Sequence, residues 1–310
     1  MRLEGLHHVT AITADAPRNV DFYAGALGLR FVKKTVNYDA PDVYHLYYGD
    51  EQGAPGSIMT FFEFPQAAPG RHGAGMIHTV AWRVAGPAAL DFWAARLEHA
   101  GRPVEREDGV VRTTDPEGIG LEIVARDVPD PPLVAASPDI PAEHALQGFD
   151  GVRAYALAPD RSRELLDRLG FDADGVLAAE QRRARYAYDA APAERGLQGA
   201  GSVHHVAWAS HDEDHEAWGE AARQAGARPT PVIDRTYFRS IYFVEPNGVL
   251  FELATLSPGF AVDEDAEHLG ESLVLPPQHE HLRSQLERTL TPVRNPREEP
   301  AWQGRSSGAS

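Results

Sequence analysis

Two pairs of adjacent histidines are the residues best suited to do chemistry in this chain. One pair is His7 and His8 in "GLHHVT", and the other is His204 and His205 in "SVHHVAW". Imidazole nitrogens are common ligands of transition metals. The chain contains no cysteine, which excludes disulfides, iron–sulfur clusters and thiol catalysis. Any bound metal must therefore be held by His, Asp, Glu or backbone oxygen.

A glutamate in an apolar strand-like run supplies a candidate carboxylate. Glu252 lies in "VLFELAT", and Glu122 lies at the same point of "GIGLEIVA", because residues 115–124 align without gaps on residues 245–254. A buried carboxylate costs several kcal/mol unless it is paired or binds a metal. Glu252 is therefore a candidate ligand, although the matching Glu122 shows that this glutamate alone could be a feature of the fold.

The elements that must position these residues repeat along the chain. A strand-like run is followed by a helix-like run and up to three further strand-like runs, four times over, the third repeat being the weakest. Each unit reads βαβββ in roughly 50 to 60 residues, which is short of an independently stable domain. Pairs of units are therefore expected to share a core.

Composition shifts along the chain suggest where its parts begin and end. We expect an N-terminal half with units one and two over 1–127, and a linker rich in proline and acidic residues over 128–146. A C-terminal half with units three and four follows over 147–262. The last part, 263–310, is expected to be an extension that is partly disordered.

Comparing the units separates the candidate ligands from their neighbours. Adjacent strand residues face opposite sides, so only one histidine of each pair should point into a given cavity. If the second histidine of each pair is the one that points inward, the inward residues of units one to four are, in order, His8, Thr79, Gly151 and His205. At the end-strand position, units one, two and four carry Thr60, Glu122 and Glu252. Two imidazoles and one carboxylate remain as a candidate facial triad for Fe(II) or Mn(II): His8, His205 and Glu252.

The remaining histidines are expected to have other roles. His45, His279 and His281 are predicted to be structural or to face solvent. His211 and His215 flank an acidic run at a predicted helix start and are predicted to face water.

Composition limits the class of protein. The chain has 310 residues, of which 43% are hydrophobic and 24% charged, with a net charge of −17. These values are typical of a globular protein, and the negative charge argues against binding to nucleic acid or to an anionic membrane. No apolar run approaches the roughly 20 residues that span a bilayer, and the N-terminal residues carry no apolar signal core. We expect a cytoplasmic enzyme or binding protein.

The units and their motifs resemble the vicinal oxygen chelate superfamily, which includes glyoxalase I, fosfomycin-resistance proteins and extradiol dioxygenases. The resemblance rests on "LHHVT", "HHVAW" and "LFELAT" and extends over about residues 4–290. Residues 37–62 and 234–255 are similar to the hydroquinone-type ring-cleaving dioxygenases, including the MhqO-like proteins. The fold that this implies is α+β, with four βαβββ modules paired into two open barrel-like sheets.

The resemblance also implies a metal site and an activity. The metal would be Fe(II), with Mn(II) as the alternative, and the ligands implied are His8, His205 and Glu252. The implied reaction opens a hydroquinone- or catechol-type aromatic diol with dioxygen, and a homo-oligomer is compatible with it. Unit three lacks the ligand histidine. Units one and four would therefore form one curved sheet, or cup, that holds the metal, and units two and three would form a second cup without a metal.

Further residues around the metal are implied only by the resemblance. They are His7, Thr10, His204, Arg235 and Tyr242, where Arg can hold a phenolate charge and Tyr or His can transfer protons. Each could instead be structural. Two other functions stay open: a glyoxalase-like isomerase, which Thr60 at the fourth ligand position disfavours, and a non-catalytic binding protein of the same fold.

Overall fold

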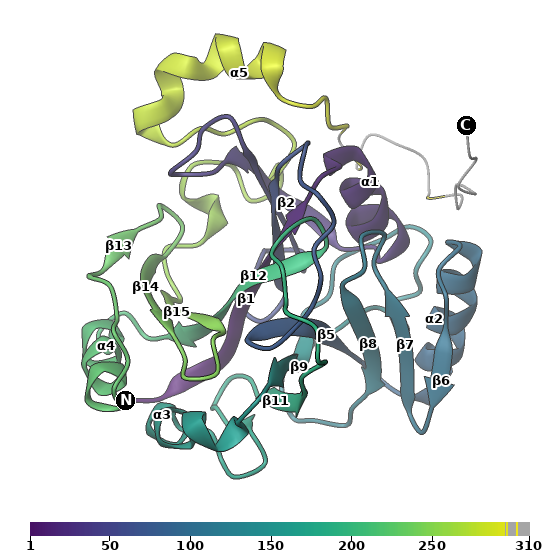
Figure 1. Cartoon of the computed structure of the whole chain (residues 1–310). Helices are drawn as coiled ribbons and strands as arrows, with labels where there is room; N and C mark the ends of the chain where they lie inside the picture. The colour runs from purple at the N-terminus through teal and green to yellow at the C-terminus, as the bar shows by residue number, and fades with distance from the viewer. Residues whose placement is uncertain (295, 297–301, 303–310) are drawn as a thin grey trace.

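The computed structural model describes residues 1–294, 296 and 302 (Figure 1). The strands of this part of the chain form two mixed sheets, and the helices lie at the periphery. None of the described helices combines the length and hydrophobicity needed to cross a bilayer. The disorder predicted near the end of the 263–310 extension falls largely outside the described residues.

The first sheet joins modules 1 and 4. Its eight strands are, in spatial order, β13 (Ile233–Asp234), β14 (Arg239–Val244), β15 (Leu250–Thr255), β12 (Ser202–Ser210), β1 (Leu3–Thr13), β4 (Ile58–Glu63), β3 (Tyr44–Gly49) and β2 (Arg30–Val36). Strands β1 and β12 meet antiparallel at the centre, where the two modules join.

The second sheet joins modules 2 and 3 in the same way. Its seven strands are, in order, β10 (Val176–Leu177), β11 (Ala184–Ala190), β9 (Phe149–Ala156), β5 (Met76–Val84), β8 (Gly120–Ala125), β7 (Val110–Thr114) and β6 (Glu105–Glu107). Strands β5 and β9 form the antiparallel junction. The two sheets confirm the predicted α+β fold of paired modules. Each sheet takes strands from both sides of the 128–146 segment, and the domain boundaries proposed from composition stay a prediction.

Each module has its helical segment after its first strand. These segments are α1 (Ala16–Val20) continued by the π-helix η1 (Asp21–Ala26), α2 (Pro87–His99), the 3₁₀ turn η2 (Pro159–Ser162) with α3 (Arg163–Leu169), and α4 (His215–Gln224). Asp15 caps α1 by accepting the backbone N–H of Arg18, and α2 begins at a proline, which needs no hydrogen bond there. The extension adds the 3₁₀ turns η3 (Phe260–Val262) and η4 (Pro277–Leu282) and the helix α5 (Arg283–Thr289).

A β-bulge interrupts the first strand of every module at one matching position. The register of β1 against β12 skips one residue at His7 and one at His204. The register of β5 against β9 skips one residue at His78 and one at Asp150. A bulge turns the extra residue out of strict alternation and commonly lies beside functional sites. The repeated bulge therefore belongs to the framework and changes where the first residue of each "HH" position points.

One hydrophobic core holds the two sheets together. Trp82 packs on Phe149 and Trp208 packs on Phe251, with ring centroids 4.4 and 5.6 Å apart, and all four belong to the same buried cluster. Burying a large apolar side chain contributes roughly 1.5–3 kcal/mol. The central strands that carry the candidate ligands are thus fixed from behind by packed aromatic rings.

Candidate metal centre and aromatic pocket

Three side chains from three neighbouring strands converge on one point. His8 Nε2 lies 3.2 Å from His205 Nε2, and Glu252 Oε2 lies 3.2 Å from the first nitrogen and 3.0 Å from the second. The three residues are 2%, 5% and 0% exposed. Within the described residues, no other group of three His, Asp or Glu side chains brings its ligand atoms together as closely. The sequence-predicted triad is therefore one spatial cluster.

Strand register explains this convergence. His8 on β1 pairs with Ala207 on β12, and Ala207 pairs in turn with Glu252 on β15. His205 lies two residues before Ala207 and so shares its face. The small side chain of Ala207 leaves the space between His8 and Glu252 open, so that the three larger side chains can meet over it.

The carboxylate of Glu252 is anchored at one oxygen and free at the other. Ser240 Oγ donates to Glu252 Oε1 at 2.5 Å, while Oε2 is buried without a hydrogen bond and faces the two imidazoles. Burial by itself would raise the pKa of Glu252, but His8 and His205 outweigh it and hold that pKa well below its usual range. The centre thus contains an ionised carboxylate with one unshared oxygen.

His7 fixes which nitrogen of His8 is available. His7 Nε2 lies 3.1 Å from the carbonyl oxygen of Thr255, which can only accept, so this nitrogen carries a proton. Burial, then the nearby His8, lowers the pKa of His7 to about 3, so the ring is neutral and its Nδ1 accepts. The partner at 2.9 Å is His8 Nδ1, which must donate. The lone pair of His8 Nε2 is then left for the centre, which is how outer residues orient metal ligands.

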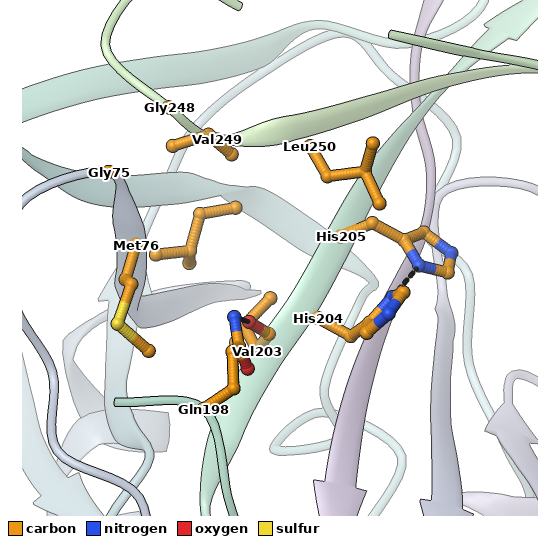
Figure 2. Close-up of a pocket in the computed structure, with 10 residues that line it drawn as sticks. Gly75, Met76, Gln198, Val203, His204, His205, Gly248, Val249 and Leu250 are labelled. Atoms are coloured by element: carbon orange, nitrogen blue, oxygen red, sulfur yellow. Dashed lines mark hydrogen bonds between the residues drawn. The ribbon is translucent and has the colours of Figure 1, made fainter. Parts of the chain in front are cut away.

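The second histidine pair repeats this contact. His204 Nδ1 lies 2.8 Å from His205 Nδ1, as the dashed line in Figure 2 shows. Burial and the neighbouring His205 lower the pKa of His204 to about 4, which keeps its ring neutral. Both residues border the same pocket. The expectation that only one histidine of a pair faces a given cavity is therefore wrong here, because the bulge at His204 breaks the alternation.

A cavity of about 640 Å³ opens in front of the triad. Its walls are rich in aromatic rings, which are those of Tyr38, Tyr47, Phe62, Phe64, Tyr237, Phe238 and Tyr242. This volume is within the range of small-molecule sites, which are largely apolar with a few placed polar groups. The arrangement suits a planar aromatic ligand.

The polar groups of this pocket gather beside His205. Arg235 Nε donates to the Tyr242 hydroxyl at 3.3 Å, and Arg235 also pairs with Asp39 at 3.1 Å. The ring of Tyr242 lies 5.9 Å from that of His205. Burial, followed by the charge of Glu252, raises the pKa of Tyr242. A neutral phenol and a guanidinium, both implied earlier by resemblance, therefore line the same wall as the triad.

The fourth position around the centre carries a hydroxyl instead of a ligand. Thr60 donates to Thr10 at 3.0 Å and lies 2.8 Å from His45 Nε2, whose other ring nitrogen is 2.7 Å from the Tyr47 hydroxyl. Thr10 thus joins the site through Thr60, and it pairs with His205 across β1 and β12. The sequence placed His45 among structural or solvent-facing histidines, whereas its ring borders the pocket. Tyr47 pairs with Thr60 across β3 and β4, and His45 lies two residues before Tyr47 and shares its face, which is the signal that could have found it.

Two more residues at the centre were not predicted. Ser240 holds Glu252, and the ring of Phe238 packs on those of His7 and His8 at 4.9 and 5.0 Å. Ser240 lies two residues before Tyr242 and shares its face, so the alternation of β14 could have indicated it. His215, expected to face water, is instead fully buried and hydrogen-bonded to Ser210 at 2.8 Å.

The C-terminal extension completes the pocket wall. Lys33 on β2 is fully buried and donates to Asp263 at 2.6 Å and to Glu264 at 2.5 Å. Asp263 also accepts from Tyr237, a wall residue, at 3.0 Å. Pro276, further along the extension, lines the pocket directly. The segment after β15 is therefore bound to module 1 and shapes the space in which a ligand would lie.

The cup of the second sheet has the same framework without the ligands. Thr79 and Gly151 take the places of the two ligand histidines. In module 3, Ala187, which pairs with Arg153, takes the place that Glu252 has in module 4. Glu122 remains, but Arg112 pairs with it across the strands and donates to it at 3.0 Å. Asp189, two residues after Ala187 on β11, is likewise paired, with Arg153 and with His78. The carboxylates on this face of the second sheet are thus engaged in ion pairs.

Comparisons with known proteins agree with this geometry. Residues 5–123 match the model of the Glyoxalase/Bleomycin resistance protein/Dioxygenase superfamily. A protein of Bacillus subtilis (strain 168), provisionally named ring-cleaving dioxygenase MhqO, is 42% identical over 93% of this chain and 96% of its own length. Chlorohydroquinone/hydroquinone 1,2-dioxygenase of Sphingobium indicum is 35% identical over 93% of this chain and 96% of its own length.

Solved structures show the same fold. The crystal structure of a provisionally assigned dioxygenase from Bacillus subtilis has a TM-score of 0.87 and 39% identity, over 95% of this chain and 98% of that one. Glyoxalase I from Zea mays, at 15% identity over 81% of this chain and 92% of its own, has a TM-score of 0.55 and shares the fold alone. The chain belongs to the glyoxalase/bleomycin resistance protein/dioxygenase superfamily.

Proposed function

We propose that this protein is an Fe(II)-dependent ring-cleaving dioxygenase that opens a hydroquinone- or catechol-type aromatic diol. The observation that carries the proposal is the convergence of two imidazole nitrogens and one carboxylate oxygen beneath an aromatic pocket. Two imidazoles and one carboxylate with open positions are typical of non-haem Fe(II) oxygenases. The relatives named for ring cleavage support the reaction class.

The donor set fits a divalent ion. Ligand atoms about 2.1 Å from an ion and at right angles to one another lie about 3.0 Å apart. The three distances among the donors are 3.2, 3.2 and 3.0 Å. The buried Oε2 of Glu252 has no hydrogen bond, and a buried acceptor without a partner is costly. His8, His205 and Glu252 would hold the ion, with Fe(II) favoured and Mn(II) as the alternative.

The chain's own residues prepare this site for a diol. When bound, Fe(II) lowers the pKa of a coordinated phenol and passes electrons between ring and dioxygen. His7 orients His8, and Ser240 orients Glu252, so that both present a free lone pair. Arg235 lies where its charge stabilises a phenolate or a developing oxyanion. Tyr242, which accepts from Arg235, and His204, which contacts His205, would hold or transfer a proton.

The reaction needs no second oxidant. The bond between a hydroxyl-bearing ring carbon and its neighbour breaks, and each of the two carbons gains one oxygen atom from the same dioxygen molecule. The ring supplies the electrons that reduce dioxygen. The apolar walls of the pocket suit the flat ring, and the Arg235 side suits its hydroxyl groups. The cytoplasmic location and a homo-oligomeric state stay predictions.

Oxygen uptake by reconstituted protein tests the proposal. The protein is freed of metal with a chelator, reloaded anaerobically with Fe(II) or Mn(II), and mixed with a panel of hydroquinones and catechols. We expect one dioxygen consumed per diol and both ¹⁸O atoms of labelled dioxygen in the product. The matched pair His205→Ala and Thr79→Ala separates the two cups, because only the first should lose activity. Full activity in the His205→Ala protein, or in rigorously metal-free protein, would contradict the proposal.

A further inference from the structure

A second, smaller cavity reaches the His204–His205 pair from another side. Its volume is about 190 Å³, and Figure 2 shows the side chains around it. Five of the residues that line it are aliphatic, and they are Met76, Ile77, Val203, Val249 and Leu250. The cavity lies where β5 of the second sheet meets β12 and β15 of the first. It is therefore formed between the two sheets, apart from the mouth of the aromatic pocket.

The two cavities share an inner wall. His204, His205 and Leu250 border both of them. In Figure 2, Leu250 and His204 lie on either side of His205. These two side chains stand between the small cavity and the space in front of the triad. A small molecule that passes between them would arrive beside His205 without crossing the aromatic pocket.

Two glycines lie in close backbone contact beside the small cavity. A Cβ atom on Gly75 would lie 2.8 Å from the carbonyl oxygen of Asn247 and 3.2 Å from the Cα of Gly248. The loop before β5 and the turn between β14 and β15 thus touch through glycines, which border the cavity. Gln198, which is exposed, lies at the same cavity and accepts from Ser202 Oγ at 2.7 Å.

We propose that this side cavity is the route by which dioxygen reaches the triad while the aromatic diol occupies the main pocket. The inference rests on the proposed function, which requires two substrates at one centre. A planar diol lying against the triad covers it from the side of the main pocket. Dioxygen is small and apolar, and the five aliphatic side chains of the side cavity suit a molecule of that kind. His204 and Leu250 form the inner end of this route, and Met76 borders it at the end away from the histidines (Figure 2).

Substitution of Met76 tests the route, because Met76 borders the side cavity and not the main pocket. In the Fe(II)-loaded Met76→Phe protein we expect the KM for dioxygen to rise about fivefold or more, while kcat at saturating dioxygen and the KM for the diol stay within about twofold. The control Phe64→Trp, in the main pocket only, should change the KM for the diol and not that for dioxygen. Met76→Ala widens the cavity and should not raise the KM for dioxygen; it provides the test if Met76→Phe does not fold.

A second readout needs neither metal nor turnover. Crystals of the metal-free protein under xenon pressure should show xenon in the side cavity of the wild type and none in Met76→Phe. A cavity without xenon, or a KM for dioxygen that Met76→Phe leaves unchanged in a working enzyme, overturns the route and leaves the proposed function intact. Absence of ring cleavage in the reconstituted wild type overturns the proposed function, and the route with it.

Discussion

The two sheets of this protein are built on one plan, yet only one of them gathers metal-ligand side chains. Both have an antiparallel central pair with a bulge in each strand, at His7 and His204 in the first and at His78 and Asp150 in the second. Both carry a glutamate on the strand beside that pair. The framework therefore supplies positions, and the side chains placed there decide whether a metal can be held.

The difference is electrostatic as well as steric. Across the strands, Glu252 faces Tyr242, whereas Glu122 faces Arg112. The Glu122 carboxylate is engaged by a guanidinium at Oε1, while the Glu252 carboxylate keeps Oε2 without a hydrogen bond. A Cβ atom on Gly151 would collide with the carbonyl oxygen of Arg185, so the second cup has no room for an imidazole at that position.

The largest effect, a loss of Fe(II) affinity, is expected when Glu252 is replaced by glutamine, and the same change at Glu122 is the comparison. Glu252→Gln removes the charge and one lone pair from the centre, so Fe(II) affinity should fall at least about 100-fold, beyond what is lost when an outer partner is removed. Glu122→Gln, the matched control, should bind Fe(II) as the wild type does. Anaerobic titration with Fe(II) measures both. Equal losses in the two variants would mean that the glutamate is a feature of the fold in both cups.

The first histidines of the two pairs sharpen the comparison. His7→Gln replaces the rigid ring nitrogen that fixes the ring of His8 with a flexible amide, and Fe(II) affinity should fall by about 10- to 100-fold. His78→Gln, at the same bulge of the second sheet, should leave it unchanged. Fe(II) titration again gives the result, and the absorption of Co(II)-loaded protein reports whether the ligand geometry has altered. An undisturbed Co(II) spectrum in His7→Gln would contradict the orienting role.

Low pH should destabilise module 4 through His215, which has no titratable counterpart at the start of the helix of module 2. Burial, then the charge of Arg239, lowers the pKa of His215 from 6.5 to about 4. As pH falls through this window, the unfolded chain takes up a proton that the folded chain does not, so the free energy of unfolding decreases and then levels off below about pH 4. The matching helix of module 2 begins with Pro87, which does not titrate.

Urea unfolding of metal-free protein between pH 7 and pH 4 measures this loss. The His215→Asn variant should lose less stability across the window than the wild type does. His268→Asn, in which an exposed ring is replaced, serves as the control and should follow the wild type. If the free energy of unfolding of His215→Asn depends on pH as that of the wild type does, the role of His215 is contradicted.

The smallest effect is expected in the second cup. Arg112 is 38% exposed, and an ion pair of that exposure contributes roughly 1 kcal/mol or less. Arg112→Met should therefore change the free energy of unfolding by no more than about 1 kcal/mol and leave ring cleavage unaffected. Urea unfolding and oxygen uptake check the two parts. Loss of iron in this variant would show that the cups are coupled.

The repeats made the fold and the triad predictable. Histidines present in units one and four and missing from units two and three pointed to His8 and His205, and the aligned turns pointed to Glu252. What could not be predicted depends on geometry that has no sequence signature. The bulges defeated strict alternation, so the contact between His204 and His205 was missed. Ser240 became visible as a partner of Glu252 only from its place in the sheet.

The pairing of β1 with β12 has a consequence for how the molecule comes to be made. These strands lie almost 200 residues apart, since the contact between His8 and His205 spans 197 positions. Contacts of such long range form late and slowly. Because β1 is synthesised before β12, its edge toward β12 stays unpaired until module 4 has been made. The ligand set is complete only when β15 has also been synthesised. Metal uptake by this centre would therefore report that modules 1 and 4 have paired, and a chain that ends before Glu252 cannot assemble the triad.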